Sequence, residues 1–426
     1  MGHADQAALA NGSYEKLMEL SLNRIDEFLA DLDNAKDDQE LRRLFQTYSA
    51  EYDLNVPEDP FSELYKNQQF RLYETLSGKA YTPENEVTKF DVEENAVRPF
   101  PYHHRSSELV GDQLMAIGFL IKAMNLPAGA SVLEFGPGWG NTTLTLAKMG
   151  YHVTAVDIEQ NFVDLISRRA AMESLEVNAI RGDFSLIESI QKRFDAILFF
   201  ECFHHSQDHL RIIQNFDRAL TPGGIVCLAS EPILDEFPIP WGLRMDGESL
   251  WAIRKNGWLE LGFQKSYFDE ALSRSGFVAV EHVGVDGPWS KVLIARRKSE
   301  MGMDLKFAPG GLSTSVGDLG PAGVRLQGDE FGYVAYGPYK RLRRGSWRVE
   351  LELDPNDAPK GFVTVDVVDE GGQSAILRPT NVDISSGSRG LGIKFQAEKD
   401  LQKFEVRVLT TQSAKGTISG IKLTYL

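Results

Sequence analysis

The chain has 426 residues, more than one ordinary domain contains, so we expect two or three domains. Hydrophobic residues make up 42% and charged residues 25%, which is typical of globular proteins and excludes a disordered or collagen-like chain. With 45 Lys and Arg against 61 Asp and Glu, the formal net charge is −16, and this sign disfavours nucleic acids and anionic membranes as partners.

The sequence shows no pattern typical of a membrane or export segment. No run of about 18 apolar residues occurs, so we expect no membrane span. The first residues lack a basic stretch followed by an apolar run, so we expect no signal peptide and a cytoplasmic location. The two cysteines, Cys202 and Cys227, predict neither a disulfide framework nor a zinc knuckle.

The hydrophobic pattern divides the chain into three regions. Residues 1–98 are acidic, and their apolar residues recur at helical spacing, which predicts a helical N-terminal region. Residues 99–298 alternate short apolar strands with helices, which is typical of a parallel α/β sheet. The expected strands are Ser131–Phe135, His152–Asp157, Glu176–Arg181, Phe194–Phe200, Gly224–Ser230, Phe277–His282 and Lys291–Ala295. The last two follow each other closely, which favours an antiparallel hairpin at the sheet edge.

Residues 299–426 are rich in strands separated by Gly, Pro, Asn and Asp, which predicts an antiparallel β-sandwich. The expected strands are Tyr333–Tyr336, Gly345–Leu353, Gly361–Asp369, Leu391–Gln396, Lys403–Leu409 and Gly416–Tyr425.

A glycine-rich loop follows the first strand of the α/β region. Gly136, Gly138 and Gly140 stand at alternate positions between an apolar strand and a predicted helix. Glycine lets the backbone turn tightly and approach a ligand, and the helix N-terminus offers free N–H groups to a carboxylate or phosphate. The spacing is G-x-G-x-G and not the dinucleotide pattern G-x-G-x-x-G, because Asn141 replaces the third dinucleotide glycine.

This loop, with Glu134 two residues before its first glycine, resembles motif I of class I S-adenosylmethionine-dependent methyltransferases. The turn Leu220-Thr221-Pro222-Gly223-Gly224 is similar to the family's L-x-P-G-G turn. The resemblance covers about residues 99–298. It implies a Rossmann-like methyltransferase domain with S-adenosylmethionine as cofactor, and it places Glu134 at the amino-acid end of that cofactor, directly or through water.

The resemblance also assigns residues at the ends of the later strands. Asp157 ends the second strand, where a carboxylate can accept hydrogen bonds from both ribose hydroxyls. Asp183 and Phe184 follow the third strand, where the family holds the adenine, and Glu201 follows the fourth strand at the mouth of the site.

The segment before the first helix of the α/β region is another candidate for the cofactor. In similar enzymes this segment closes over the methionine end of the cofactor. Tyr102 and Arg105 would do so here, and Arg105 would form an ion pair with a carboxylate. An ordinary surface loop is the alternative. His103 and His104 are secondary candidates for the acceptor side.

Methyl transfer to a hydroxyl requires removal of its proton. His204 and His205 follow the fourth strand, where related methyltransferases often carry a histidine, so either one is a candidate general base. Alternatively, they pack against the cofactor or cap the next helix. His205, Asp208 and His209 also have a spacing that suits a metal, but a solvated helix start explains them more simply, and we expect no metal.

A long insert from Glu231 to about Tyr267 separates the fifth strand from the last helix. Its residues Trp241, Arg244, Trp251 and Trp258 are candidate substrate contacts, because flat aromatic faces beside polar groups suit a sugar or another polyol. A packed lid in which the tryptophans form the core is the alternative.

In the C-terminal region, Gly337-Pro338-Tyr339 followed by Gly345-Ser346-Trp347-Arg348-Val349 resembles a pattern of β-sandwich modules in bacterial glycan-modifying enzymes. A structural or dimerisation module is the alternative.

Taken together, these features lead us to expect a methyltransferase that modifies an oxygen of a saccharide or saccharide-linked small molecule. A nicotinamide-dependent oxidoreductase and a non-catalytic carbohydrate-binding or scaffold protein remain as alternatives. The sequence does not indicate the oligomeric state.

Overall fold

The computed structural model describes residues 22–51, 56–97, 107–284, 290–354, 356–386 and 392–426. The chain forms two compact units, Met1–Arg296 and Arg297–Leu426, and each is described by itself. The predicted division of the first unit between residues 98 and 99 stays a prediction. Among the described helices, none is long and apolar enough to cross a membrane.

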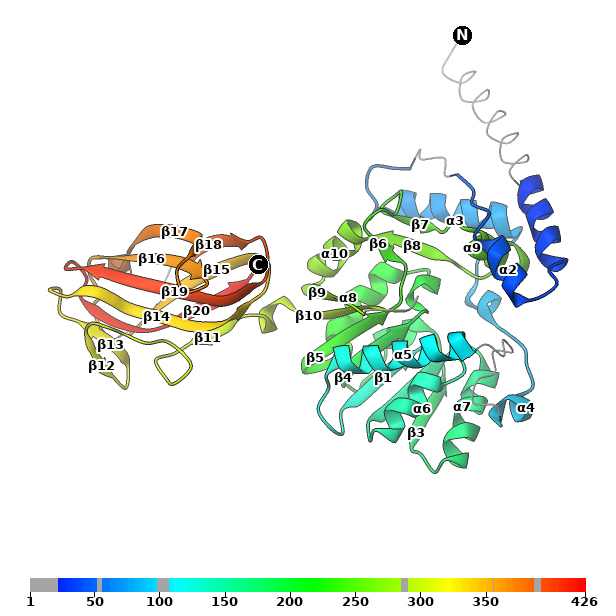
Figure 1. Cartoon of the computed structure of the whole chain (residues 1–426), viewed down its shortest axis with the longest axis horizontal. Coiled ribbons are helices and arrows are strands. Elements are labelled where there is room, and N and C mark those ends of the chain that lie inside the picture. Colours follow the sequence, from blue (N-terminus) through cyan, green and yellow to red (C-terminus); the bar gives the residue numbers. More distant parts are fainter. Residues whose placement is uncertain (1–21, 52–55, 98–106, 285–289, 355, 387–391) are drawn as a thin grey trace, which may run out of the picture. The chain divides into compact units, whose positions relative to one another are not determined.

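The first unit is built on a seven-stranded sheet with strand order β3-β2-β1-β4-β5-β10-β9 (Figure 1). Its strands are β1 (Ser131–Phe135), β2 (His152–Asp157), β3 (Val177–Arg181), β4 (Phe194–Phe200), β5 (Leu220–Ala229), β9 (Phe277–Val283) and β10 (Lys291–Arg297). The five strands β1 to β5 pair with one another in parallel, whereas β10 runs antiparallel to β5. The predicted parallel α/β sheet is therefore present, with β9 and β10 at one edge.

Helices cover both faces of this sheet. They are α5 (Ser107–Met124), α6 (Asn141–Lys148), α7 (Gln160–Met172), α8 (His209–Ala219) and α10 (Lys265–Arg274). Neighbouring residues of a strand point to opposite faces. Accordingly, Val132 of β1 belongs to a core with Leu120 of α5, and the adjacent Leu133 belongs to a second core with Phe216 of α8 and Phe268 of α10.

The N-terminal segment packs against the insert that follows β5. Residues 22–33 are helical, followed by α2 (Asp38–Phe45), α3 (Glu63–Ser77), η1 (Pro83–Glu86) and α4 (Val92–Ala96). The insert contains β6 (Ile233–Leu234), β7 (Trp241–Leu243), α9 (Gly247–Trp251), η4 (Ala252–Asn256) and β8 (Leu261–Gln264). On α3, Tyr65 and Tyr73 donate hydrogen bonds to the carbonyl oxygens of Trp241 (2.8 Å) and Gly257 (2.6 Å). Segments about 180 residues apart in sequence thus form one layer, seen with α3 beside β7 and β8 in Figure 1.

The second unit consists mainly of antiparallel strands in two sheets. One sheet has the order β12-β13-β20-β15-β18 with β11 beside β20, and the other has the order β14-β19-β16-β17. The strands are β11 (Met303–Leu305), β12 (Asp318–Gly320), β13 (Gly323–Leu326), β14 (Phe331–Leu342), β15 (Gly345–Leu353), β16 (Phe362–Asp369), β17 (Ser374–Asp383), β18 (Gly392–Ala397), β19 (Leu401–Thr411) and β20 (Gly416–Tyr425). Buried residues of both sheets, such as Leu351 and Val408, join in one core, so this region is β-rich as predicted.

Candidate active site

All three glycines of the loop after β1 have left-handed backbone conformations, with φ of 58° at Gly136, 48° at Gly138 and 76° at Gly140. A Cβ atom on Gly136 would lie 2.6 Å from Cβ of Cys202, and one on Gly140 would lie 2.6 Å from Cγ1 of Ile166. A Cβ on Gly138 would meet no atom within 4 Å. Gly136 and Gly140 are thus required by close packing, whereas Gly138 leaves open space.

A cavity of about 350 Å³ opens beside this loop, at the carboxyl ends of the parallel strands. The structure brings six of the predicted cofactor residues together in its wall. They are Gly136, Gly138, Asp157, Asp183, Phe184 and Glu201. This is the edge at which open parallel sheets bind ligands, because the strand order reverses between β1 and β4.

Asp157 is the buried carboxylate of this wall. Its Oδ2 accepts a hydrogen bond from the backbone N–H of Gly138 (3.1 Å), and its Oδ1 accepts one from the N–H of Glu159 (2.9 Å). Burial raises the pKa of Asp157 to about 6, although both hydrogen bonds favour the ionised form. The carboxylate therefore fixes the glycine loop and still lines the cavity.

Two predicted cofactor residues lie outside the cavity wall. Glu134 is buried within β1 and accepts a hydrogen bond from the Thr143 hydroxyl (2.6 Å), and burial raises its pKa to about 7. Gly140 caps α6 and packs on Ile166. One carboxylate oxygen of Glu134 thus has Thr143 as its partner, and the expected role of Glu134 at the amino-acid end of the cofactor, directly or through water, stays a prediction. Tyr102 and Arg105, with His103 and His104, lie outside the described residues.

The cavity wall also contains Asp183, an exposed residue that accepts a hydrogen bond from the N–H of Ser185 (2.8 Å), and the half-buried Phe184, which packs on Phe135. The wall also includes Tyr81, Glu86 and Phe162, which the sequence analysis missed. Tyr81 and Glu86 come from the N-terminal segment, and no local pattern marked them.

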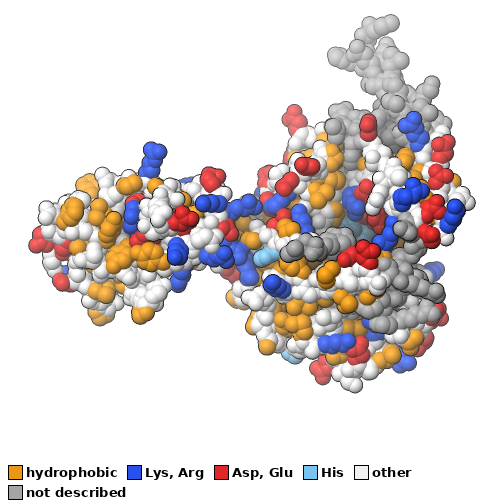
Figure 2. Space-filling view, viewed as in Figure 1, with side chains coloured by type: hydrophobic (Ala, Val, Ile, Leu, Met, Phe, Trp, Pro, Cys, Tyr) orange, Lys and Arg blue, Asp and Glu red, His pale blue; other side chains and the backbone are white. Residues whose placement is uncertain are grey.

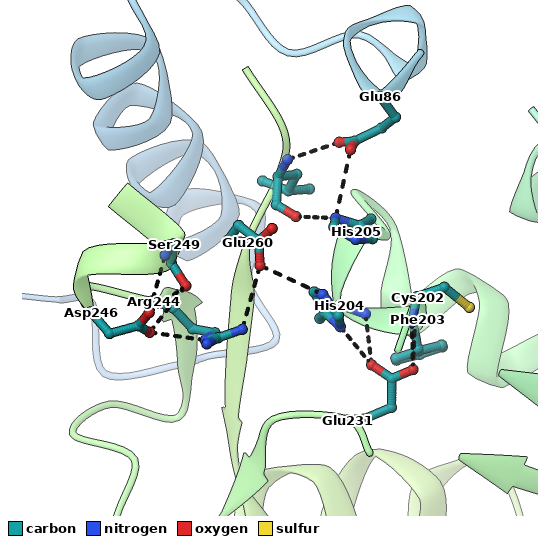
Figure 3. Close-up of polar contacts among 11 residues, drawn as sticks. Glu86, Cys202, Phe203, His204, His205, Glu231, Arg244, Asp246, Ser249 and Glu260 are labelled. Atoms are coloured by element: carbon teal, nitrogen blue, oxygen red, sulfur yellow. Dashed lines mark hydrogen bonds and ion pairs between the residues drawn. The ribbon is translucent and has the colours of Figure 1, made fainter. Parts of the chain in front are cut away.

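Glu231, two residues after β5, holds the segment that carries the histidine pair (Figure 3). Its Oε1 accepts hydrogen bonds from the N–H groups of Cys202 and Phe203, both 2.9 Å. Its Oε2 accepts one from the N–H of His204 (3.1 Å) and lies 2.8 Å from Nδ1 of the same residue. These hydrogen bonds lower the pKa of Glu231 against the effect of its burial.

His204 and His205 are in contact, with ring centroids 4.2 Å apart. Burial alone would lower the pKa of His204, but the hydrogen bond and charge of Glu231 raise it. Burial, and then the charge of His204, lower the pKa of His205 to about 4. Nδ1 of His205 lies 2.6 Å from the carbonyl oxygen of Leu259, and Nε2 of His204 lies 3.5 Å from Oε2 of Glu260.

The metal site considered around His205, Asp208 and His209 is not formed. Nε2 of His209 lies 2.7 Å from the hydroxyl of Tyr267 in the core, and Asp208 pairs with Lys66. A different group, His204, His205 and Glu260, brings one possible ligand atom from each residue within 4.8 Å of the others. Glu260 escaped the sequence analysis because it lies 55 positions beyond His205.

A second, larger cavity of about 1220 Å³ adjoins the first and shares Glu201, His205 and Trp258 with it. Three of the predicted substrate residues, Arg244, Trp251 and Trp258, line it, and their contact with a substrate stays a prediction. Trp241 does not line it, because it is only 2% exposed, packs on Tyr65 and donates its indole N–H to the carbonyl of Pro60 (2.8 Å). The prediction for Trp241 is therefore wrong, and the packed-core alternative holds for this residue.

The second cavity has an acidic wall. Its carboxylates are Glu51, Glu201, Glu231, Glu236, Asp246, Glu248 and Glu260. Among the described residues, the Arg and Lys side chains that line it are Arg244 and Lys291. Arg244 lies between Asp246 (3.1 Å) and Glu260 (3.4 Å), so its charge is already paired.

Comparison with known proteins gives a family for this site. Residues 132–224 match the family of methyltransferase domains. The ubiquinone biosynthesis O-methyltransferase of Coxiella burnetii is 33% identical over 96 residues, which is 22% of this chain and 41% of that protein. The demethylmenaquinone methyltransferase of Tropheryma whipplei is 31% identical over 114 residues, 26% of this chain and 46% of that protein.

Among solved structures, an S-adenosylmethionine-dependent methyltransferase from Aquifex aeolicus aligns with a TM-score of 0.34 and 18% identity, covering 49% of this chain and 98% of that one. The chain spans less than half the length of the curated relatives it matches. The matched segment runs from β1 to β5 and includes the glycine loop, Asp157 and Asp183. Residues 132–224 therefore form a methyltransferase domain, as predicted, with S-adenosylmethionine as its cofactor.

Proposed function

We propose that this protein transfers the methyl group of S-adenosylmethionine, bound in the first cavity, to an acceptor bound in the second. The observation that carries this proposal is the shared wall, because Glu201, His205 and Trp258 line both cavities. Methyl transfer is an in-line displacement, so the acceptor atom and the sulfonium methyl group must meet with little freedom. Two adjoining cavities provide that arrangement.

In this proposal the cofactor lies along the carboxyl ends of β1 to β4. Asp157 accepts hydrogen bonds from the ribose hydroxyls, and Asp183 and Phe184 hold the adenine. Gly136 and Gly138 let the backbone approach the amino-acid end of the cofactor. Glu134 helps to orient the amino-acid end of the cofactor, and it accepts a hydrogen bond from Thr143 of the helix that follows the loop.

We propose a polar, hydroxyl-bearing acceptor, such as a saccharide or a saccharide-linked small molecule. Seven carboxylates in the cavity wall suit hydroxyl donors, and Trp251 and Trp258 add flat faces beside them. The curated relatives are named for ubiquinone and demethylmenaquinone. A quinone ring would desolvate several of these carboxylates without satisfying them, so the wall favours the polar acceptor.

The reaction forms a bond between an acceptor oxygen and the methyl carbon, while the carbon–sulfur bond breaks and its electron pair stays on sulfur. The acceptor hydroxyl must also lose its proton. We propose that His204 and His205 are the catalytic pair on the acceptor side, because both line the second cavity and His205 also lines the first. Nδ1 of each ring lies against a fixed acceptor, so Nε2 is the atom available for the reaction, and Nε2 of His204 also lies 3.5 Å from Oε2 of Glu260.

For the C-terminal unit we propose a β-sandwich that assists glycan binding, with a purely structural role as the alternative. It exposes large aromatic side chains on β14 and β16, with Phe331 69% and Phe362 53% exposed. Figure 2 shows hydrophobic side chains over much of its visible face. Exposed aromatic rings suit the apolar faces of sugars.

The test of the cofactor uses thermal unfolding of the full chain with S-adenosylhomocysteine or with NAD. A ligand that binds the folded state raises the unfolding temperature, so we expect a shift with S-adenosylhomocysteine alone. A shift with NAD alone would overturn the proposal. For the acceptor, the protein is incubated with labelled S-adenosylmethionine and a lysate separated into glycans, lipids, small molecules and proteins. Label in the glycan or polar small-molecule fraction is expected, and label confined to lipid quinones would contradict the polar acceptor.

A further inference from the structure

We propose that His204, His205 and Glu260 bind a divalent metal ion of the zinc class at the junction of the two cavities. One possible ligand atom from each residue lies within 4.8 Å of the others. All three side chains line the second cavity, and His205 also lines the first. Figure 3 shows His204 between Glu231 and Glu260, with His205 beside it. Two imidazoles and one carboxylate form a ligand set typical of catalytic zinc, with further positions open to water or substrate.

The distance between His204 and Glu260 supports coordination over a direct hydrogen bond. Nε2 of His204 lies 3.5 Å from Oε2 of Glu260, longer than an ordinary hydrogen bond of about 2.9 Å. Two ligand atoms that each lie about 2.1 Å from a tetrahedral Zn²⁺ are about 3.4 Å apart. The observed separation of an ion pair at 3.5 Å is therefore also compatible with two ligands of one ion.

Both imidazoles are oriented as metal ligands usually are. Nδ1 of His205 lies 2.6 Å from the carbonyl oxygen of Leu259, and Nδ1 of His204 lies 2.8 Å from Oε2 of Glu231. A carbonyl or carboxylate oxygen only accepts, so each Nδ1 carries a proton, and a ring without a second proton offers the lone pair of Nε2 to a metal ion. Metal-bound histidines characteristically donate their other N–H to such an acceptor.

The surroundings of the cluster also favour a cation. Glu231 and Glu260 are buried, and the half-buried Glu86 lies 3.6 Å from Nδ1 of His205. Arg244 contacts the same oxygen, Oε2 of Glu260, and shares its charge with Asp246 (Figure 3). Buried carboxylates that outnumber the nearby cations are costly, and a divalent ion offsets that excess of negative charge.

The ligand types select the class of ion. Mg²⁺ and Ca²⁺ prefer sets made of oxygen alone, whereas two imidazoles suit Zn²⁺, Co²⁺ and similar ions. The consequence for catalysis rests on the proposed function: an ion here would bind the acceptor hydroxyl and ease loss of its proton to water before the oxygen attacks the methyl group. His204 and His205 would then act as ligands and not as free bases.

The experiment measures Co²⁺ binding to the full-length protein after treatment with a chelator. We expect one Co²⁺ per chain, a visible absorption band of a nitrogen-ligated site, and displacement of the band by Zn²⁺. His204→Ala and Glu260→Gln should each weaken Co²⁺ binding by at least about 100-fold. Glu248→Gln removes another carboxylate from the same wall and is the matched control, in which the band should remain.

A second variant alters the support of a ligand and not a ligand itself. Glu231→Gln disturbs the partner of Nδ1 of His204 and the backbone N–H groups that the carboxylate accepts, so the folded variant should bind Co²⁺ about 10–100-fold more weakly. Each variant is first checked for S-adenosylhomocysteine binding, which shows that the domain is folded. Failure of the wild type to bind stoichiometric Co²⁺, or equal binding by wild type and folded Glu260→Gln, would overturn the metal site. Stoichiometric Co²⁺ binding without methyl transfer would instead count against the proposed function alone.

Discussion

Oε2 of Glu231 lies 2.8 Å from Nδ1 of His204 and also accepts the backbone N–H of that residue. The other oxygen accepts the N–H groups of Cys202 and Phe203. One carboxylate after β5 thus fixes three consecutive residues after β4. The geometry of the histidine pair depends on a contact between the ends of two neighbouring parallel strands.

Replacing this carboxylate should destabilise the domain. In Glu231→Gln, the amide N–H₂ group must face N–H donors that the carboxylate now accepts, which leaves buried donors unsatisfied. We expect the free energy of unfolding to fall by about 3 kcal/mol, measured by urea denaturation in the presence of chelator. Glu236→Gln alters an exposed carboxylate of the same cavity and should change it by less than about 0.5 kcal/mol. Equal stability of both variants would show that Glu231 does not support this segment.

Alanine substitutions at two glycines of the loop should have different effects, one on stability and the other on ligand binding. Alanine at either Gly138 or Gly140 is strained by about 1–2 kcal/mol, because both residues have positive φ. Gly140→Ala also collides with Ile166, so its free energy of unfolding should fall by about 1–3 kcal/mol more. Gly138→Ala places its methyl group in open space at the cavity wall and should mainly weaken S-adenosylhomocysteine binding. Urea denaturation and titration calorimetry measure the two effects, and the reverse ranking of stability would contradict this assignment.

The sheet and the cofactor wall were predictable because their signals are local. An apolar strand, a glycine turn and a helix adjoin in sequence, and the carboxyl ends of parallel strands meet at one edge, so Asp157 and Asp183 could be placed together. Of the cluster formed by His204, His205 and Glu260, only the two histidines could be predicted from the sequence. His204 stands beside a strand end, but its partner Glu260 approaches from the insert and carries no local pattern.

Trp241 shows why the insert was misjudged. A tryptophan in a polar insert has the same local sequence whether it binds a sugar or fills a core. Its burial is decided by Tyr65 and Pro60, which lie about 180 residues earlier in the chain. By contrast, Trp251 and Trp258 lie in the cavity wall, as the substrate prediction requires.

Removal of the C-terminal unit should leave cofactor binding intact. A chain that ends at Arg296 retains the whole first unit, including both of its cores and every residue of the first cavity wall. We expect its S-adenosylhomocysteine affinity, measured by calorimetry, to stay within about threefold of the full chain. A folded truncated chain, judged by circular dichroism, that no longer binds this ligand would show that the units are not independent. Lost turnover with retained binding would place the second unit in acceptor recognition.

Binding of S-adenosylhomocysteine should depend on pH through Asp157. Burial raises the pKa of this carboxyl to about 6, so below pH 6 the ligand-free protein holds it protonated. Ribose hydroxyls donate hydrogen bonds and favour the ionised form, so binding must release that proton at low pH. The affinity for S-adenosylhomocysteine should therefore rise by up to about tenfold between pH 5 and pH 6, the pH unit below the pKa of Asp157. It should level off towards pH 7. Asp157→Asn should flatten this rise and weaken binding at pH 7 by about 2–4 kcal/mol, measured by calorimetry.

Glu134 supplies the control for this pH dependence, because burial raises its pKa to about 7, in an overlapping range. It lies behind the loop with its carboxylate against Thr143, so Glu134→Gln should keep the rise between pH 5 and pH 6 that belongs to Asp157. Its own effect should be on stability: the folded state binds the Glu134 proton up to about pH 7 and the unfolded chain only to about pH 4.5. The wild type should thus lose free energy of unfolding as pH rises between these values, and Glu134→Gln should lose less. If Asp157→Asn keeps the full pH dependence of binding while Glu134→Gln abolishes it, Glu134 and not Asp157 is the carboxylate whose ionisation the cofactor requires.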